Sequence, residues 1–409
     1  MQKKTVWSRN FTIITLGTLI SAIGGAGITL GLTLVVFDQT QSTWLSGVYA
    51  VVSRLPGLTL PVLLSPLIDR MNRKHMVVVL DVLNGLAYLG FMVFILQRGF
   101  EYGAYLLFGL LTSSIGMIYS LAYSSLYPDM IPEGMEQKGY AVSSMIYPIA
   151  SIAVTPVAAL LYEKWNIEIL FFIVGTALLI AAAFESRIDY VHVHRSRPKQ
   201  NRLRQYADDL LEGFRYLKQE TGVRSIFAYR MIAGAVTGAN QNMAVAFFQT
   251  SGTLTTPMYA LLSSAEAAGR FIGSMVHYVL RIPPEKRYAL CVNMYAVYDL
   301  CDGVMLFMEY PVMIVIRFLC GFLGTQTKAS QYVAVQRYLP SDMRARVNGL
   351  FSVLCVLSSM VVQLIIGALG EVLPYQWVTA LFAGVSLTTI FFMLIRNKRH
   401  VERIYNTYV

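Results

Sequence analysis

Long apolar runs separated by short polar turns dominate the sequence. Each run reaches about the 20 residues that an α-helix needs to cross the hydrocarbon core of a bilayer. The runs lie at roughly residues 11–37, 44–68, 75–97, 102–127, 139–162, 167–186, 225–250, 256–280, 287–308, 311–336, 346–370 and 375–395. This pattern predicts an all-α polytopic membrane protein with twelve transmembrane helices. The first run is too long for the core of a signal peptide, so we expect it to remain as the first helix.

The composition agrees with this pattern. Hydrophobic residues make up 56% of the 409 residues and charged residues 14%, which inverts the usage of soluble domains. A net charge of +10 could suggest a nucleic-acid partner, but the placement of the charges argues against one. If both termini are cytoplasmic, 26 of the 33 Lys and Arg residues lie on the cytoplasmic side and 2 lie in outside loops. By the positive-inside rule, we predict a multi-pass protein of the cell membrane with both termini in the cytoplasm.

Short motifs recur along the chain at an offset near 210 residues. Tyr49-Ala50 returns as Tyr259-Ala260, and the Ile-Pro pair at 131–132 returns as Leu-Pro at 339–340. The recurrence predicts two pseudo-symmetric six-helix halves, 1–186 and 224–409, with a substrate site between them near the bilayer midplane. The linker, 187–223, is basic and contains an expected amphipathic helix at 201–219, which is either a simple connector or a coupling element.

A charged turn between the second and third apolar runs is the strongest motif. It reads Asp69-Arg70-Met71-Asn72-Arg73-Lys74. The turn resembles the G-x-x-x-D-R-x-G-R loop, followed by Arg or Lys, of major facilitator superfamily transporters, with Ser65 and Asn72 in place of the two glycines. The resemblance implies a conformational role for Asp69, Arg70, Arg73 and Lys74. We expect Asp81, about two turns into the third helix, to join the same cytoplasmic charge cluster.

Three further stretches narrow the resemblance. Residues 154–162, 211–217 and 344–347 are similar to the bacterial drug:proton antiporter branch that contains macrolide-efflux proteins and the enterobactin exporter. Two features depart from that branch. Small residues replace glycines of the fifth-helix antiporter motif around Pro156, and the fourth helix lacks the arginine of the family's motif.

We single out eight ionisable residues within the predicted helices, where each charge costs at least ~2.5 kcal/mol and needs a partner, water or a task. They are Arg54, Arg230, Glu266, Arg270, Asp299, Asp302, Arg317 and Lys328. Glu266 and Arg270 are four residues apart and share one helix face. They form either an intrahelical ion pair or a proton-coupling site in which Glu266 takes up and releases a proton. For Asp299, Asp302 and Arg317 we predict a structural brace.

Polar and aromatic residues on the expected cavity helices are candidates for substrate binding. They are Arg54, Tyr119, Tyr123, Tyr127, Asn240, Gln241, Arg270, Gln326 and Lys328. A tyrosine stripe can equally be core packing, although buried phenols require hydrogen-bond partners. Such a lining fits an organic molecule of mixed polarity better than a small inorganic ion.

The sequence therefore predicts a secondary-active exporter of an amphiphilic organic compound that exchanges its substrate for protons by alternating access. We expect a monomer in the lipid bilayer, without cofactor or metal. An importer or an uncoupled facilitator is the first alternative, because both antiporter motifs are eroded. A membrane enzyme is a third class, but none of the five histidines has a nucleophile or metal partner at recognisable spacing.

Overall fold

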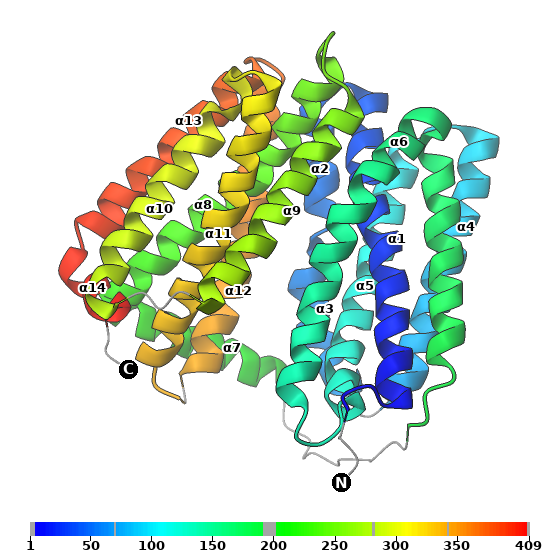
Figure 1. Cartoon of the computed structure of the whole chain (residues 1–409), viewed down its shortest axis with the longest axis horizontal. Coiled ribbons are helices and arrows are strands. Elements are labelled where there is room, and N and C mark those ends of the chain that lie inside the picture. The colour runs from blue at the N-terminus through cyan, green and yellow to red at the C-terminus, as the bar shows by residue number, and fades with distance from the viewer. Residues whose placement is uncertain (1–4, 69–70, 191–201, 280–282, 342, 407–409) are drawn as a thin grey trace. The chain divides into compact units, whose positions relative to one another are not determined.

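The computed structural model describes residues 5–68, 71–190, 202–279, 283–341 and 343–406, and all regular elements in these ranges are helical (Figure 1). The predicted all-α fold class is confirmed. The α-helices are α1 (Arg9–Thr40), α2 (Thr43–Val52), α3 (Leu55–Ile68), α4 (Arg73–Arg98), α5 (Tyr102–Met130), α6 (Glu136–Glu185), α7 (Arg202–Gln219), α8 (Thr221–Thr250), α9 (Thr256–Val279), α10 (Pro284–Val304), α11 (Tyr310–Tyr338), α12 (Arg344–Gly370), α13 (Tyr375–Thr389) and α14 (Lys398–Tyr405). A short 3₁₀ turn, η1 (Met305–Phe307), extends α10, and a π-helical turn, η2 (Ile390–Ile395), extends α13.

Every predicted membrane span corresponds to helix in the structure, with two differences in continuity. The second span is broken into α2 and α3 at Ser53 and Arg54, just before Pro56, which has no backbone N–H to continue a helix. The fifth and sixth spans run together as α6, where Trp165 and Asn166 leave the helical conformation and Asn166 has φ of 57°. By length and composition alone, eight helices within the described ranges are long and apolar enough to cross a membrane.

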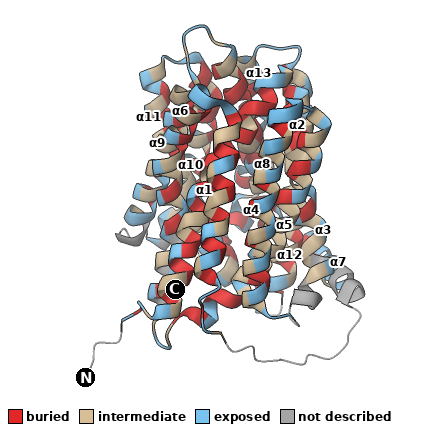
Figure 2. Ribbon diagram, turned by 90° about the vertical axis from the view of Figure 1, so that its right-hand side faces the viewer, coloured by how far each residue is buried: buried red, intermediate tan, exposed pale blue. Residues whose placement is uncertain are grey.

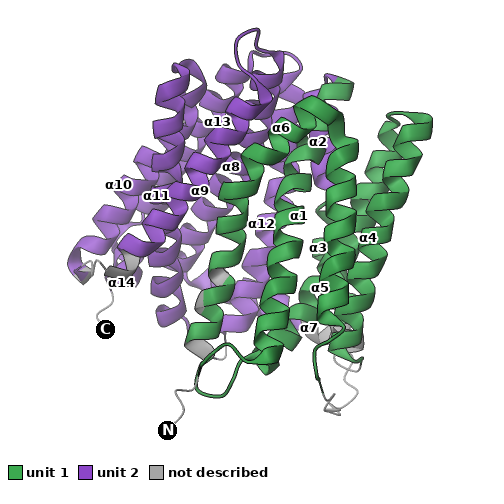
Figure 3. Cartoon of the chain, turned by 45° about the vertical axis from the view of Figure 1, so that its right-hand side comes forward, with its two compact units in different colours: residues 1–40, 52–203 green, residues 41–51, 204–409 purple. Residues whose placement is uncertain are grey.

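The described chain divides into two compact units (Figure 3). Unit 1 contains residues 1–40 and 52–203, and unit 2 contains residues 41–51 and 204–409. The chain therefore enters unit 2 for the length of α2 and returns to unit 1 before α3. Figure 2 shows that buried and exposed residues alternate along most helices, as expected for helices that each pack one face against neighbours.

Unit 1 is built on the packing of α1 and α4 against α6. Glycines make the close approaches: a Cβ on Gly31 would meet side chains of Ile167 and Leu170 at 2.7 and 2.6 Å, and a Cβ on Gly85 would meet the carbonyl oxygen of Gly175 at 2.9 Å. Phe11 and Leu126 are fully buried in the core nearer the amino-terminal end of α1.

Unit 2 includes α2, which packs on the end of α12. Thr43 donates its hydroxyl to the carbonyl oxygen of Gly367 at 2.7 Å, and the backbone N–H of Trp44 donates to Oε1 of Glu371 at 2.8 Å. Ser42 also donates to that oxygen, at 2.7 Å. Partial burial opposes ionisation of Glu371, but these hydrogen bonds outweigh it and hold the pKa of Glu371 below its usual value. Gly367 allows the approach, since a Cβ there would lie 2.9 Å from the carbonyl oxygen of Thr43.

The predicted linker helix is present as α7 and packs within unit 2. Its Asp209 and Glu212 both pair with Arg346 at the start of α12, at 2.8 and 2.9 Å. Leu217 is buried against the unit 2 core, whereas the side chain of Phe214 is 57% exposed. The apolar face of α7 is thus divided between packing on the bundle and an outer surface, and its two acidic residues fasten it to α12.

Candidate functional site

A cavity of about 500 Å³ lies within unit 2 among α8, α9, α10 and α11. This volume falls in the range of pockets that hold drug-sized ligands. Its wall combines tyrosines, ionisable groups and small residues. The polar lining residues are Tyr229, Arg230, Thr237, Gln241, Glu266, Arg270, Tyr295, Tyr298, Asp299, Thr325, Thr327, Lys328 and Tyr332. Such a wall offers both aromatic faces and fixed charges to a bound molecule.

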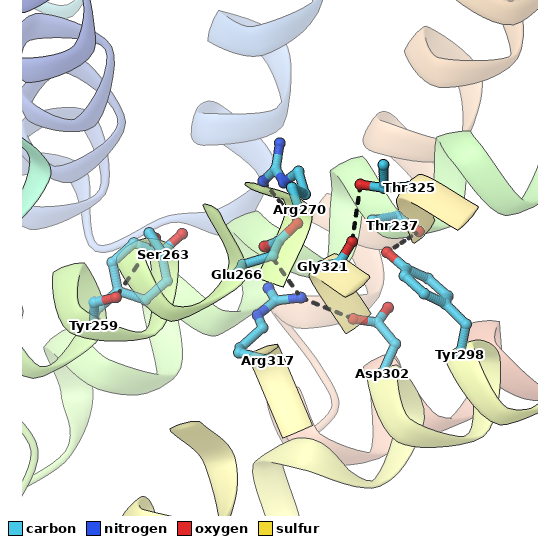
Figure 4. A network of polar contacts seen from close by, with 10 residues as sticks. All are labelled: Thr237, Tyr259, Ser263, Glu266, Arg270, Tyr298, Asp302, Arg317, Gly321 and Thr325. Carbon is cyan, nitrogen blue, oxygen red and sulfur yellow. Dashed lines mark hydrogen bonds and ion pairs between the residues drawn. The ribbon is translucent and has the colours of Figure 1, made fainter. Parts of the chain in front are cut away.

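A chain of charges borders this cavity (Figure 4). Nη2 of Arg270 donates to Oε1 of Glu266 at 2.8 Å, and Nη1 of Arg317 lies 3.8 Å from Oε2 of the same carboxylate. Arg317 also donates to Oδ1 of Asp302 at 3.1 Å. Asn240 donates to the other Asp302 oxygen at 2.8 Å. The alternating charges offset one another, which makes their burial among apolar helices tolerable.

The two arginines in this chain differ in exposure. The side chain of Arg317 is 3% exposed, whereas that of Arg270 is 51% exposed. The contact between Glu266 and Arg270 is present, as both alternatives for Glu266 require, and a proton-coupling role stays a prediction. The Arg317 to Asp302 part of the predicted brace is confirmed. Arg317 is the buried centre of the network and Arg270 is its accessible end.

Glycines bring two helices of the network, α9 and α11, together. A Cβ on Gly269 of α9 would clash with the carbonyl oxygen of Phe318 on α11, and a Cβ on Gly321 would clash with that of Glu266. Because both residues lack a Cβ, the backbones of α9 and α11 can touch. This contact carries Glu266 to within reach of Arg317.

Asp299 stands apart from the network, which corrects the predicted three-residue brace. Its Oδ2 accepts hydrogen bonds from Ser386 at 2.6 Å and from Tyr229 at 3.2 Å. Two hydroxyl donors, rather than the guanidinium of Arg317, therefore satisfy this carboxylate. The guanidinium of Arg230 lies over the ring of Tyr295, 5.8 Å from its centroid.

The structure brings together four of the residues predicted for substrate binding and proton coupling. Gln241, Glu266, Arg270 and Lys328 line the cavity. Asn240 and Gln326 are buried beside the cavity, and their side chains hydrogen-bond to other parts of the protein. Asn240 donates to Asp302, and Gln326 donates to the carbonyl oxygen of Gly273 at 2.6 Å. Arg54 belongs to unit 1 and is not part of this wall.

Tyr119, Tyr123 and Tyr127 also belong to unit 1. Their rings stack in sequence, with centroids 5.8 and 5.3 Å apart. Tyr119 donates to Glu185 at 3.4 Å, the hydroxyls of Tyr123 and Thr18 lie 2.8 Å apart, and Tyr127 donates to the carbonyl oxygen of Gly139 at 2.8 Å. These contacts favour the packing interpretation, and a role in binding substrate stays a prediction.

The charged turn is only partly within the described ranges, because Asp69 and Arg70 lie outside them. Arg73 donates to Asp129 on α5 at 3.3 Å and to the carbonyl oxygen of Ser125 at 2.9 Å. Lys74 is half-buried at the start of α4. The turn therefore connects α4 to the end of α5 through an acid that the sequence did not single out.

Asp81 has a different partner from the one we predicted. The structure buries Asp81 on α4 against Glu185 at the end of α6, with the two carboxyl groups in contact. Among the described residues, no cation lies within ion-pair distance of either group. Oδ2 of Asp81 and Oε2 of Glu185 have no hydrogen-bond partner, and Gly17 on α1 leaves room for the Glu185 side chain. Sequence reasoning missed Glu185 because it sought a cation for Asp81.

We expect Glu185→Gln to raise the free energy of unfolding by on the order of 1 kcal/mol at pH 8. The amide removes one of two acids buried side by side, and its N–H can donate to the unpartnered oxygen of Asp81. The gain should shrink at pH 5, because the proton that one of two buried carboxyl groups must hold is taken from solution at a lower free-energy cost there. Thermal unfolding of the purified protein at both pH values measures this. A loss of stability at pH 8, or the same change at both pH values, would contradict it.

The sequence of the chain is similar to a known protein family and to a known efflux protein. The family model described as Major Facilitator Superfamily matches residues 8–298. Macrolide efflux protein A of Streptococcus pyogenes is 23% identical over 226 residues, which cover 54% of this chain and 55% of that protein, so the alignment spans only about half of each.

Solved structures of similar fold cover nearly the whole chain. The nucleoside transporter NupG has a TM-score of 0.70 at 14% identity over 94% of this chain and 98% of that one. A bacterial homologue of the iron transporter ferroportin, solved in an inward-facing state, has a TM-score of 0.70 at 15% identity over 98% of this chain and 99% of that one. At these identities the likeness shows a shared fold.

Proposed function

The chain belongs to the Major Facilitator Superfamily of transporters, and from this premise we propose that it is a proton-coupled exporter of an amphiphilic organic compound. The observation that carries the proposal is the unit 2 cavity, where a carboxylate, Glu266, lies beside the accessible cation Arg270 and the polar side chain of Gln241. The partial similarity to a macrolide efflux protein supports the outward direction. In this proposal the cavity opens alternately to the two sides of the membrane, in a monomer with both termini in the cytoplasm.

Proton coupling is assigned to Glu266 because it is the acid that touches both the cavity and its cations. Glu266 accepts a hydrogen bond from Arg270 and faces Arg317, so two guanidinium groups lie beside its carboxylate. Movement of either arginine away from it would make the buried carboxylate take up a proton. A change in the shape of the cavity could therefore be coupled to the uptake of a proton by Glu266. Arg270, the exposed partner, would be the side chain that moves.

The network also favours a second candidate function. Two guanidinium groups hold the Glu266 carboxylate, so a network that stays rigid during transport would leave the transporter without proton exchange. The protein would then be a facilitator that equilibrates its substrate, in either direction.

Transport by purified protein in liposomes separates the two. With 5-carboxyfluorescein as test compound, an exporter coupled to protons should accelerate uptake under a pH gradient of one sign and slow it under the other. Glu266→Gln should abolish the acceleration and retain exchange at equilibrium, because the amide keeps a hydrogen bond to Arg270 but binds no proton.

Glu309→Gln is the matched control, since Glu309 precedes α11 in the same unit and is exposed. It should behave as the unaltered protein. Equal rates under both gradients in the unaltered protein would support the facilitator. Full gradient-driven accumulation by Glu266→Gln would move the proton-binding group away from Glu266.

A further inference from the structure

The unit 2 cavity contains more positive charge than its carboxylates neutralise. Three cations line it: Arg230 on α8, Arg270 on α9 and Lys328 on α11. They are close enough for Lys328 to lie within electrostatic range of the other two. Like charges gathered inside a membrane protein are unfavourable unless an anion joins them.

Only one of the three cations has a carboxylate partner. Arg270 pairs with Glu266 at 2.8 Å. Within the described part of the chain, no carboxylate lies within ion-pair distance of Arg230 or of Lys328. Arg230 instead faces the ring of Tyr295, and the side chain of Lys328 is exposed to the cavity.

The two acids of the wall are already engaged. Glu266 lies between the guanidinium groups of Arg270 and Arg317. Asp299 accepts hydrogen bonds from Tyr229 and Ser386 through one oxygen. Glu266 also lies within electrostatic range of Lys328, and Asp299 within that of Arg230, but neither acid forms an ion pair with these cations. Arg230 and Lys328 therefore remain available as donors to a further anionic group.

From this arrangement we propose that the cavity binds an organic anion whose carboxylate lies between Arg230 and Lys328. Tyr295, Tyr298 and Tyr332 supply aromatic surface for the apolar part of the same molecule. Guanidinium and ammonium groups are the side chains that recognise carboxylates in proteins, and their hydrogen bonds to a charged group are the stronger kind. The inference rests on the proposed function, in that it names the substrate class of the same site.

Two xanthene dyes of opposite charge test the proposal. Binding of 5-carboxyfluorescein, an anion, and of rhodamine 6G, a cation, to the purified full-length protein is measured by fluorescence anisotropy. We expect 5-carboxyfluorescein to bind more tightly than rhodamine 6G. Lys328→Gln and Arg230→Gln should each lower the affinity for the anion by about tenfold or more, which corresponds to the loss of one charged hydrogen bond. The affinity for the cation should stay unchanged or rise.

Arg98→Gln is the matched control, because Arg98 is an exposed cation at the end of α4 in unit 1 and should change neither affinity. Unchanged anion affinity in both cavity variants, or an equal loss for both dyes, would overturn the anion site. Because Lys328 is exposed, its replacement is not expected to unfold the protein, and a melting curve checks this.

Binding and transport fail separately. The anisotropy experiment needs no liposomes and no gradient, so it tests the charge of the ligand alone. Anion binding that depends on Lys328, together with no movement of 5-carboxyfluorescein across the liposome membrane, would support the anion site and overturn the exporter.

Discussion

Replacing Arg317 with methionine should lower the free energy of unfolding by about 3–5 kcal/mol. Arg317 is almost fully buried and faces two carboxylates, Asp302 at 3.1 Å and Glu266 at 3.8 Å. Methionine fills similar space but leaves both acids without this guanidinium, and an uncompensated buried charge is costlier than a missing pair. Denaturant titration of the purified protein in detergent micelles measures the loss.

Arg270→Met is the control for this prediction. It removes a cation that lies 2.8 Å from the same Glu266 carboxylate, but the side chain that is removed is 51% exposed. Solvent screens that pair, so the expected loss is about 0–1 kcal/mol. Equal losses in the two variants would show that burial of Arg317 does not set its contribution, and Asp302→Asn added to Arg317→Met should restore part of the stability.

Gly321→Ala and Gly269→Ala should each lower the free energy of unfolding by about 1–3 kcal/mol. In both cases the new methyl group would collide with a backbone carbonyl oxygen of the facing helix, which cannot rotate away as a side chain can. The helices α9 and α11 must then separate. Because Gly321 touches the backbone of Glu266, its variant should also weaken the contact between Glu266 and Arg317.

Gly384→Ala on α13 serves as the comparison. A Cβ at Gly384 has no neighbour within 4 Å, so alanine should be neutral or should add up to about 1 kcal/mol through its better helix propensity. The same denaturant titration applies. If Gly321→Ala is as stable as Gly384→Ala, the close approach of α9 and α11 does not limit stability.

The sequence could predict those parts of the fold that depend on neighbouring residues along the chain. Hydrophobic length located every predicted span. In the structure the fifth and sixth meet at Asn166, whose short side chain tolerates positive φ. The break in the second span was not predicted, because the apolar run continues across it, although Pro56 cannot donate to the turn before it.

The contacts of the candidate site were likewise predictable only in part. The pair Glu266–Arg270 follows from spacing on one helix, and the contact between Arg317 and Asp302 from the requirement that buried charges find partners. No such rule joins Asp81 to Glu185, because two acids are not expected to seek one another. The close approach of α9 and α11 at Gly269 and Gly321 could not be predicted either. A glycine in the sequence indicates that space is needed, but it does not indicate which helix occupies that space.

The place of α2 in unit 2 has a consequence for how the protein is made. Thr43 and the Gly367 carbonyl that it bonds are 324 residues apart, so at about 5–20 residues per second the ribosome needs roughly 15–65 s to supply the partner. During that time α2 is a finished helix without its docking surface, while α3 and the rest of unit 1 emerge after it. The contacts that Glu371 makes with Ser42 and Trp44 therefore form only after most of the chain has been made, and they tie the start of the nascent chain to the end of α12.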